Sequence, residues 1–220
     1  MCAEATQHGA ARLAGLVERR ERLLNHQSAI RRCDRCVVAG LIEEAWPVFH
    51  GDVSARVMIV GQAPALRRSE HPLPYSGASG RVLRGWLARA GFDPDGFYRD
   101  FYLTSLTKCF PGAGRSGKGD RPPGAAEIAN CRDHLLGELA LVQPEVILPL
   151  GKLAAGFFIP EARRRPLDDL VGRRFEYGPA LVLPLPHPSG VSRWLNLPAN
   201  RALLDQALDQ LNALRREWDL

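Results

Sequence analysis

Two short stretches of this sequence carry polar groups directly after apolar runs that resemble buried strands. The run Val57–Val60 ends in Gly61-Gln62-Ala63-Pro64, and a later apolar segment ends in His187-Pro188-Ser189. Ligands bind at the carboxyl ends of the strands in α/β sheets. We therefore expect these two turns to meet at one edge with two further strand ends, Ser105–Cys109 and Leu150-Gly151. The first turn has no carboxylate, so any chemistry at this turn must proceed without a carboxylate base of its own.

Four of the five cysteines are candidates for a metal site. Cys33 and Cys36 form a C-x2-C pair that lets two thiolates reach one metal, Cys109 follows a predicted strand, and Cys131 lies on a predicted helix. A disulfide framework does not suit a cytoplasmic chain of this size. Four thiolates bind zinc or an iron–sulfur cluster, and the spacing does not choose between them or exclude four reduced, buried cysteines.

The elements that must position these residues alternate between strand and helix. Apolar β-branched runs predict strands near residues 57–61, 101–109, 146–151 and 180–186, and the segment 173–177 is expected to pair with the last of them. Helical periodicity predicts helices near 78–91, 125–142 and 198–218, with a short helix at 152–158. An N-terminal helix over about 10–30 has a predicted apolar stripe of Leu13, Leu16, Val17, Leu23 and Leu24. The pattern predicts a single α/β domain over 1–220, with three α/β/α layers around a mainly parallel four-stranded sheet. The glycine-rich segment at about 111–124 is expected to be a mobile loop.

The net charge and the first residues indicate the kind of partner and the location to expect. The net charge of +5 and the pI near 9.2 suit a polyanionic partner without requiring one. No apolar run approaches the roughly 20 residues of a membrane span, and the first residues lack the apolar core of a signal peptide. We therefore expect a cytoplasmic protein, with a monomer as the default state.

Taken together, these segments resemble the uracil-DNA glycosylase superfamily, most closely its branch with a four-iron cluster. The resemblance runs from about Cys33 to Ala213 and includes an aromatic followed by x-G-x-x-G and a segment similar to L-G-x-x-A. The matching segments are Cys33–Cys36, Gly61–Pro64, Tyr75–Gly80, Thr104–Cys109, Cys131, Leu150–Ala154 and His187–Ser189. The resemblance implies a [4Fe–4S] cluster on Cys33, Cys36, Cys109 and Cys131, in preference to zinc.

Three residues depart from patterns found in this superfamily. Ala63 stands where some members have Asp or Asn to orient the attacking water, although the iron–sulfur branch also lacks that group. Gln62 replaces the Glu that is usual in this branch. Ser105 replaces the Asn that reads the uracil edge, and a hydroxyl is shorter and more adaptable than an amide.

The resemblance also implies roles for individual residues. His187 would donate to the uracil O2, while the turn containing Gln62 and Ala63 would direct backbone N–H groups at the base. Gly61, Tyr75, Gly77 and Ser105 would form the base pocket, with Tyr75 stacking on the flipped base. Ser189, Ser192 and Arg193 would contact DNA, and Trp194 would either fill the vacated stack or pack in the core. Arg32, Arg35, Lys108 and Arg115 are candidate phosphate contacts.

The leading hypothesis is therefore a monofunctional glycosylase that hydrolyses the N-glycosidic bond of uracil in DNA during base excision repair. A second enzyme hypothesis keeps the chemistry but assigns another deaminated base, hypoxanthine or xanthine, because of Ser105. A third is a non-catalytic iron–sulfur or zinc protein that binds DNA. His187 and Tyr75 argue against the third hypothesis, because DNA binding alone requires neither.

Overall fold

A five-stranded sheet forms the centre of the computed structural model, which describes residues 2–66, 69, 72–114, 119–190 and 192–220. The strand order is β2-β1-β3-β5-β4. The strands are β1 (Val57–Gly61), β2 (Phe101–Ser105), β3 (Val146–Pro149), β4 (Phe175–Tyr177) and β5 (Ala180–Val182). The first four strands in this order are parallel, and β4 pairs antiparallel with β5. The expectation of four strands is therefore wrong by one, because the short hairpin partner β4 adds an antiparallel edge.

Seven α-helices are found in the described part of the chain. They are α1 (Cys2–Arg31), α2 (Arg35–Val38), α3 (Ala78–Arg89), α4 (Phe97–Asp100), α5 (Ala125–Val142), α6 (Gly151–Phe158) and α7 (Pro198–Trp218). Four 3-10 turns join them: η1 (Pro94–Gly96), η2 (Pro160–Arg163), η3 (Leu167–Asp169) and η4 (Trp194–Asn196). The predicted last helix is found at its predicted bounds, with Pro198 at the first position, where its missing N–H costs no helical bond. Among the described residues, none of the helices combines the length and the apolar character of a membrane span.

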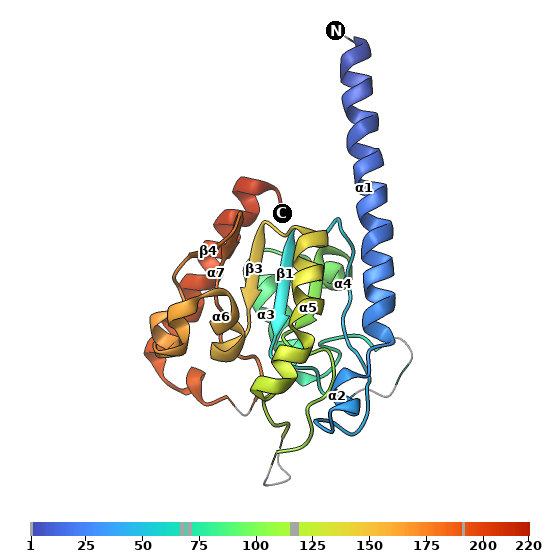
Figure 1. The fold of residues 1–220 in the computed structure, drawn as a ribbon. Helices are drawn as coiled ribbons and strands as arrows, with labels where there is room; N and C mark the ends of the chain where they lie inside the picture. Colours follow the sequence, from blue (N-terminus) through green and yellow to red (C-terminus); the bar gives the residue numbers. More distant parts are fainter. Residues whose placement is uncertain (1, 67–68, 70–71, 115–118, 191) are drawn as a thin grey trace.

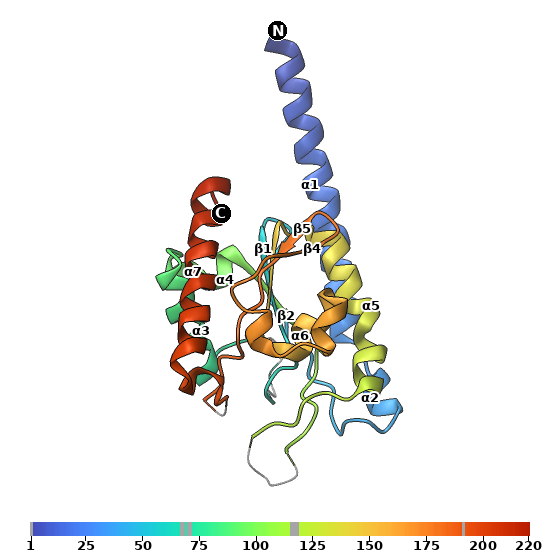
Figure 2. The same cartoon turned by 90° about the vertical axis from the view of Figure 1, so that its left-hand side faces the viewer.

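Alternation along the strands divides the core between the two faces of the sheet. Val57 and Ile59 of β1 pack with α3 and α7, whereas Met58 and Val60 pack with α1, α5 and α6. The two helical layers lie on opposite sides of the sheet in the edge view (Figure 2). Because successive strand side chains point to opposite faces, buried strands with apolar residues throughout need cover on both sides. The predicted three-layer α/β/α class is confirmed.

Helix α1 contacts the body only along its second part, and its beginning extends beyond the rest of the molecule (Figure 1). Leu23 and Ile30 are buried, whereas Val17 and Leu24 are 64% and 58% exposed. The expected apolar stripe is therefore confirmed at Leu23 and wrong at Leu16, Val17 and Leu24. The side chain of Leu13 lies outside the described residues. The buried face instead follows the spacing of Leu23, Gln27 and Ile30, which packs beside α5.

The glycine-rich segment folds back on itself where it is described. The Gly114 N–H donates to the Gly119 carbonyl, and the Arg121 N–H donates to the Gly112 carbonyl at 3.0 Å. Arg121 also pairs with Glu127 at the start of α5. Residues 115–118, including the candidate phosphate contact Arg115, lie outside the described residues.

Candidate functional site

The Gly61 turn and the strand end that begins at Ser105 meet at one edge of the sheet, as predicted. Gly61 is paired with Ser105 in the parallel register of β1 and β2. Beyond the strands, the Leu106 N–H donates to the Gly61 carbonyl at 2.9 Å and the Thr107 N–H donates to the Gln62 carbonyl at 3.3 Å. Gln62 and Ala63 are half-buried directly beside this junction. The two turns are therefore one connected structure.

Tyr75 lies over this junction in a constrained backbone conformation. A Cβ added to Gly61 would stand 2.6 Å from the Tyr75 hydroxyl oxygen and 3.8 Å from the Ser105 Cβ. Only a residue without a side chain allows this close approach. Tyr75 itself has a φ of 54°, and its ring meets Phe97 edge-on. Burial raises the pKa of the Tyr75 phenol, so its hydroxyl keeps its proton at neutral pH.

The conformation of Tyr75 depends on Gly80 in the first turn of α3. A Cβ on Gly80 would collide with the backbone carbonyl of Tyr75, and backbone cannot move aside as a flexible side chain can. Gly77 is the N-cap residue of the same helix. The x-G-x-x-G pattern after the aromatic therefore has a steric origin: it lets the helix begin directly beside Tyr75.

His187 reaches the same edge from the segment that follows β5. The Leu150 N–H donates to the Val60 carbonyl, and the Gly151 N–H donates to the Leu185 carbonyl, so these segments are joined. Gly151, at a φ of +83°, would place a Cβ 3.4 Å from the His187 Cβ. These contacts bring the L-G segment and the His-Pro-Ser turn together as expected.

The protonation state of His187 follows from its contacts. The Ser189 N–H donates to His187 Nδ1 at 3.2 Å, so Nδ1 is an acceptor and carries no proton. Burial lowers the pKa of His187, which favours the neutral ring at neutral pH. A neutral imidazole whose Nδ1 accepts must carry its proton on Nε2. His187 is thereby prepared as a hydrogen-bond donor through Nε2.

Ser105 is 5% exposed at the end of β2. Its Oγ lies 2.7 Å from the Thr107 carbonyl oxygen. A carbonyl can only accept, so the serine hydroxyl donates its one proton there and keeps only lone pairs for another partner. Ser105 is therefore an acceptor in this arrangement.

The segment after His187 has an exposed side. Ser189 and Ser192 are half-buried and Arg193 is exposed, and the Ser192 N–H donates to the Ser189 carbonyl at 3.0 Å. Trp194, for which filling a base stack and core packing were both open, packs against the hydrophobic core between the sheet, α3 and α7.

The four candidate cysteines border one small cavity. Cys33 and Cys36 flank the start of α2, Cys109 follows β2 and Cys131 lies on α5, and all four line this space together with apolar side chains such as Ile30 and Ile42. Cys131 Sγ accepts the Lys108 backbone N–H at 3.3 Å, and Asn130 Nδ2 lies 3.9 Å from Cys36 Sγ. Three segments that are distant in the sequence therefore bring their cysteine thiols to the same cavity.

The chemistry of this donor set suits a thiolate-bound metal. The pKa of Cys109 is raised to about 12, first by burial and then by the nearby thiols of Cys131, Cys33 and Cys36. A cation among the sulfurs would reverse this effect, because ligating thiols are deprotonated. In the described residues, however, no three or more His, Cys, Asp or Glu side chains stand at metal-holding distances.

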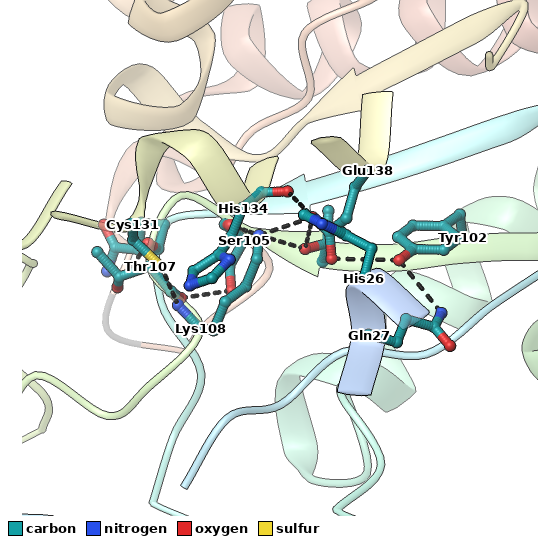
Figure 3. A network of polar contacts seen from close by, with 11 residues as sticks. His26, Gln27, Tyr102, Ser105, Thr107, Lys108, Cys131, His134 and Glu138 are labelled. Atoms are coloured by element: carbon teal, nitrogen blue, oxygen red, sulfur yellow. Dashed lines mark hydrogen bonds and ion pairs between the residues drawn. The ribbon is translucent and has the colours of Figure 1, made fainter. Parts of the chain in front are cut away.

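Lys108 is not a phosphate contact, in contrast to expectation. Its side chain is 1% exposed, and its Nζ lies 2.8 Å from Glu138 Oε2, with Glu138 fully buried on α5. Nζ also donates to Thr104 Oγ1 and to the Ser105 carbonyl, both at 2.7 Å. Figure 3 shows this network beside Cys131 and His134. Of the other candidate phosphate contacts, Arg32 bonds Ser28, and Arg35 bonds the Asn130 carbonyl on α5.

Sequence reasoning missed this network, although a signal for it was present. Cys131, Leu135 and Glu138 are spaced at i, i+4 and i+7, which places them on one face of a helix. Glu138 accepts from Tyr102 and Thr104 on β2, and Tyr102 in turn accepts from Gln27 on α1. An acidic residue on the inner face of α5 required a buried cationic partner.

Comparison with known protein families shows which family this chain belongs to. The family model of the uracil DNA glycosylase superfamily matches residues 48–212. The chain belongs to this superfamily. The matched region contains β1, the Tyr75 segment, β2, α5 and the His187 turn, so the resemblance found in the sequence is confirmed.

Individual relatives support the same assignment. The Type-4 uracil-DNA glycosylase of Pyrobaculum aerophilum is 30% identical over 147 residues, which are 67% of this chain and 65% of that protein. The Type-4 enzyme of Thermotoga maritima is 26% identical over 195 residues, 86% of this chain and 92% of that protein. The Type-5 uracil-DNA glycosylase of Pyrobaculum aerophilum is 36% identical over 115 residues, 47% of this chain and 48% of that protein. The chain thus spans just under two thirds of the first relative's length, nearly all of the second and about half of the third.

The contact between Gly80 and Tyr75 generates a prediction about stability. We expect Gly80→Ala to lower the free energy of unfolding by about 1–3 kcal/mol, because the new methyl group must displace backbone. Gly85→Ala in the same helix meets open space and is expected to raise stability by up to about 1 kcal/mol. Denaturant unfolding of both variants checks this. Equal stability of the two variants would show that Gly80 does not constrain Tyr75.

Proposed function

We propose that this protein is a DNA glycosylase that hydrolyses the N-glycosidic bond of uracil in DNA, a reaction of base excision repair. Family membership and the Type-4 relatives support the reaction class, which is hydrolysis of N-glycosyl bonds. The observation that carries the proposal is the fixed donor state of His187, at the same sheet edge as the Gly61 turn and Tyr75.

The proposed mechanism relies on stabilising the leaving base. As the glycosidic bond breaks, the sugar moves toward an oxocarbenium ion and negative charge develops on uracil. The His187 Nε2–H donates to the uracil O2, where this charge gathers, and backbone N–H groups in the turn of Gln62 and Ala63 contribute further donors. A water molecule then attacks C1′ of the sugar, and the proton it loses neutralises the departed uracil anion, directly or through solvent. No carboxylate is required in the first turn, because the base leaves as a stabilised anion.

The pocket is proposed to hold a base that has left the duplex. Extrusion of a base costs a few kcal/mol, which stacking on Tyr75 partly recovers. Gly61 and Gly77 keep the space around the ring free of side chains, and Ser105 faces the edge of the base. Ser189, Ser192 and Arg193 contact the DNA backbone beside it, and these contacts weaken with added salt.

The four cysteines are proposed to hold a [4Fe–4S] cluster, with zinc as the alternative. The cluster would tie the segment before β1, the end of β2 and α5 together beside the DNA-binding face. Hydrogen bonds from the Lys108 N–H and the Asn130 amide reach the sulfurs of Cys131 and Cys36, as is common for ligating thiolates.

Another deaminated base is a second candidate substrate, and the orientation of Ser105 favours it. With its proton committed to the Thr107 carbonyl, Ser105 can accept from the ring N–H of uracil but cannot donate to the uracil O4. Hypoxanthine and xanthine carry a ring N–H of the same kind. A serine that only accepts from this ring N–H discriminates less between bases than an asparagine amide, which also donates hydrogen bonds.

Base release tests the proposed function and the role of His187. We expect the wild-type protein to release uracil from an oligonucleotide, leaving an alkali-labile site, and His187→Ala to do so about 10²–10³-fold more slowly. His50→Ala serves as the matched control, because the His50 ring bonds the Tyr98 carbonyl and packs edge-on against the Tyr98 ring, and Tyr98 is not among the residues proposed for the pocket. Release of a purine but not of uracil would select the second candidate. No release from any substrate, by protein that still binds DNA, would refute the glycosylase proposal.

Metal analysis tests the proposed cluster separately. We expect the purified protein to contain about four iron atoms and matching acid-labile sulfide, with visible absorbance that Cys131→Ser strongly reduces, because one of four ligands is lost. Cys2→Ser is the control, since Cys2 lies outside the group of four, and it should leave the absorbance unchanged. Stoichiometric zinc without iron would overturn the cluster in favour of the alternative.

A further inference from the structure

A lysine with no access to solvent lies at the end of β2, between the proposed pocket and the cysteines. Its ammonium has three partners: Glu138 Oε2 at 2.8 Å, Thr104 Oγ1 at 2.7 Å and the Ser105 carbonyl at 2.7 Å. An ammonium carries three donors, so every one is used. The polar end of Lys108 is therefore held in one place.

The same residue also contacts the cysteine site through its backbone. The Lys108 N–H donates to Cys131 Sγ at 3.3 Å, and the next residue is Cys109. Glu138, the partner of the ammonium, lies two turns along the same helix as Cys131. Lys108 thus contacts α5 twice, through its charge and through its N–H (Figure 3).

The other end of this arrangement is the turn that carries Ser105. The ammonium fixes the Ser105 carbonyl, while the Ser105 hydroxyl is fixed by the Thr107 carbonyl and the Thr107 N–H by the Gln62 carbonyl. Together with the N–H groups of Leu106 and Lys108, which donate to the Gly61 carbonyl and to Cys131 Sγ, these bonds give every residue from Ser105 to Lys108 a backbone partner. The direction of the Ser105 lone pairs depends on this turn.

Stability alone does not explain a charge pair in this position. A buried ion pair typically contributes no more to stability than well-packed apolar residues of similar size, since both charges lose their hydration. What the pair supplies is a fixed geometry, because a displaced ammonium would leave a buried carboxylate unpaired. Its contacts identify what is fixed: the Ser105 turn relative to α5.

We propose that Lys108 is a positioning residue that sets the orientation of Ser105 toward the base and joins the base pocket to the cysteine site. This inference rests on the proposed function for its catalytic consequence only. Lys108 acts through Ser105 and does not contact the substrate. Its loss should therefore slow base release more than it weakens DNA binding.

The variants must remove the charge pair without leaving one charge buried. Lys108→Met alone leaves Glu138 unpaired and is a poor test if it fails to fold. The double variant Lys108→Met/Glu138→Gln is neutral and retains an amide able to bond Thr104 and Tyr102. Tyr102→Phe is the matched control, because it removes the hydroxyl at the opposite side of Glu138, where Gln27 also bonds, without touching Ser105.

Single-turnover kinetics gives the first readout. We expect the double variant to release uracil about 10-fold to 100-fold more slowly, with oligonucleotide affinity within about threefold of wild type, and Tyr102→Phe to resemble wild type in both. The triple variant, which combines Ser105→Ala with the double variant, should release uracil little more slowly than Ser105→Ala alone. The effects of residues that act through one another on the rate are not additive. Fully additive losses, or an unchanged rate, would overturn the proposal.

Amide hydrogen exchange gives a readout independent of activity. In the double variant we expect the Thr107 and Lys108 amides to exchange at least about tenfold faster than in wild type, with those of β1 unchanged. Unchanged exchange at both amides would overturn the proposal even if the rate of release falls. If wild-type protein releases no base, the proposed function fails, and exchange still decides whether Lys108 holds the turn.

Discussion

The buried ion pair between Lys108 and Glu138 is the constraint on which the arrangement of the site depends. Neither charge has access to water, so each can be present only if the other stands within bonding distance. Lys108 follows β2 and Glu138 lies on α5, so the pair fixes the helix against the end of the strand. Cys131, on the same face of α5, is brought beside Cys109 by this requirement.

A second constraint comes from the parallel sheet. The carboxyl ends of β1 and β2, and the segments that continue β3 and β5, are joined by backbone hydrogen bonds beyond the strands themselves. Groups from distant parts of the chain, Tyr75 and His187 among them, are therefore held on a rigid edge. Preorganised donors are effective because they need no reorganisation as charge develops. The proposed reaction therefore needs no carboxylate in the first turn.

Part of the fold and of the candidate site could be predicted from the sequence. Periodicity gave α7 and the alternation of strands and helices, and the order of motifs identified the superfamily, because these signals are local or ordered along the chain. The sequence predicts the segment that forms β4 as the partner of the strand at 180–186, but the predicted four-stranded sheet leaves it out, because three residues carry little periodicity. The prediction of Lys108 as a phosphate contact rests on its position near the proposed cluster, and the residue that keeps it buried, Glu138, lies on a distant helix. The exposure of Val17 and Leu24 depends on how α1 leaves the body, which no local pattern records.

Measuring the tautomer of His187 is the most direct test of the central claim. That claim is that the fold holds a neutral histidine as a hydrogen-bond donor to the leaving base. Nitrogen-15 NMR of labelled protein at neutral pH, assigned with His187→Gln, measures it. The account predicts a neutral ring with the proton on Nε2 and a bare Nδ1 that accepts from the Ser189 N–H. A protonated imidazolium, or a proton on Nδ1, would contradict it.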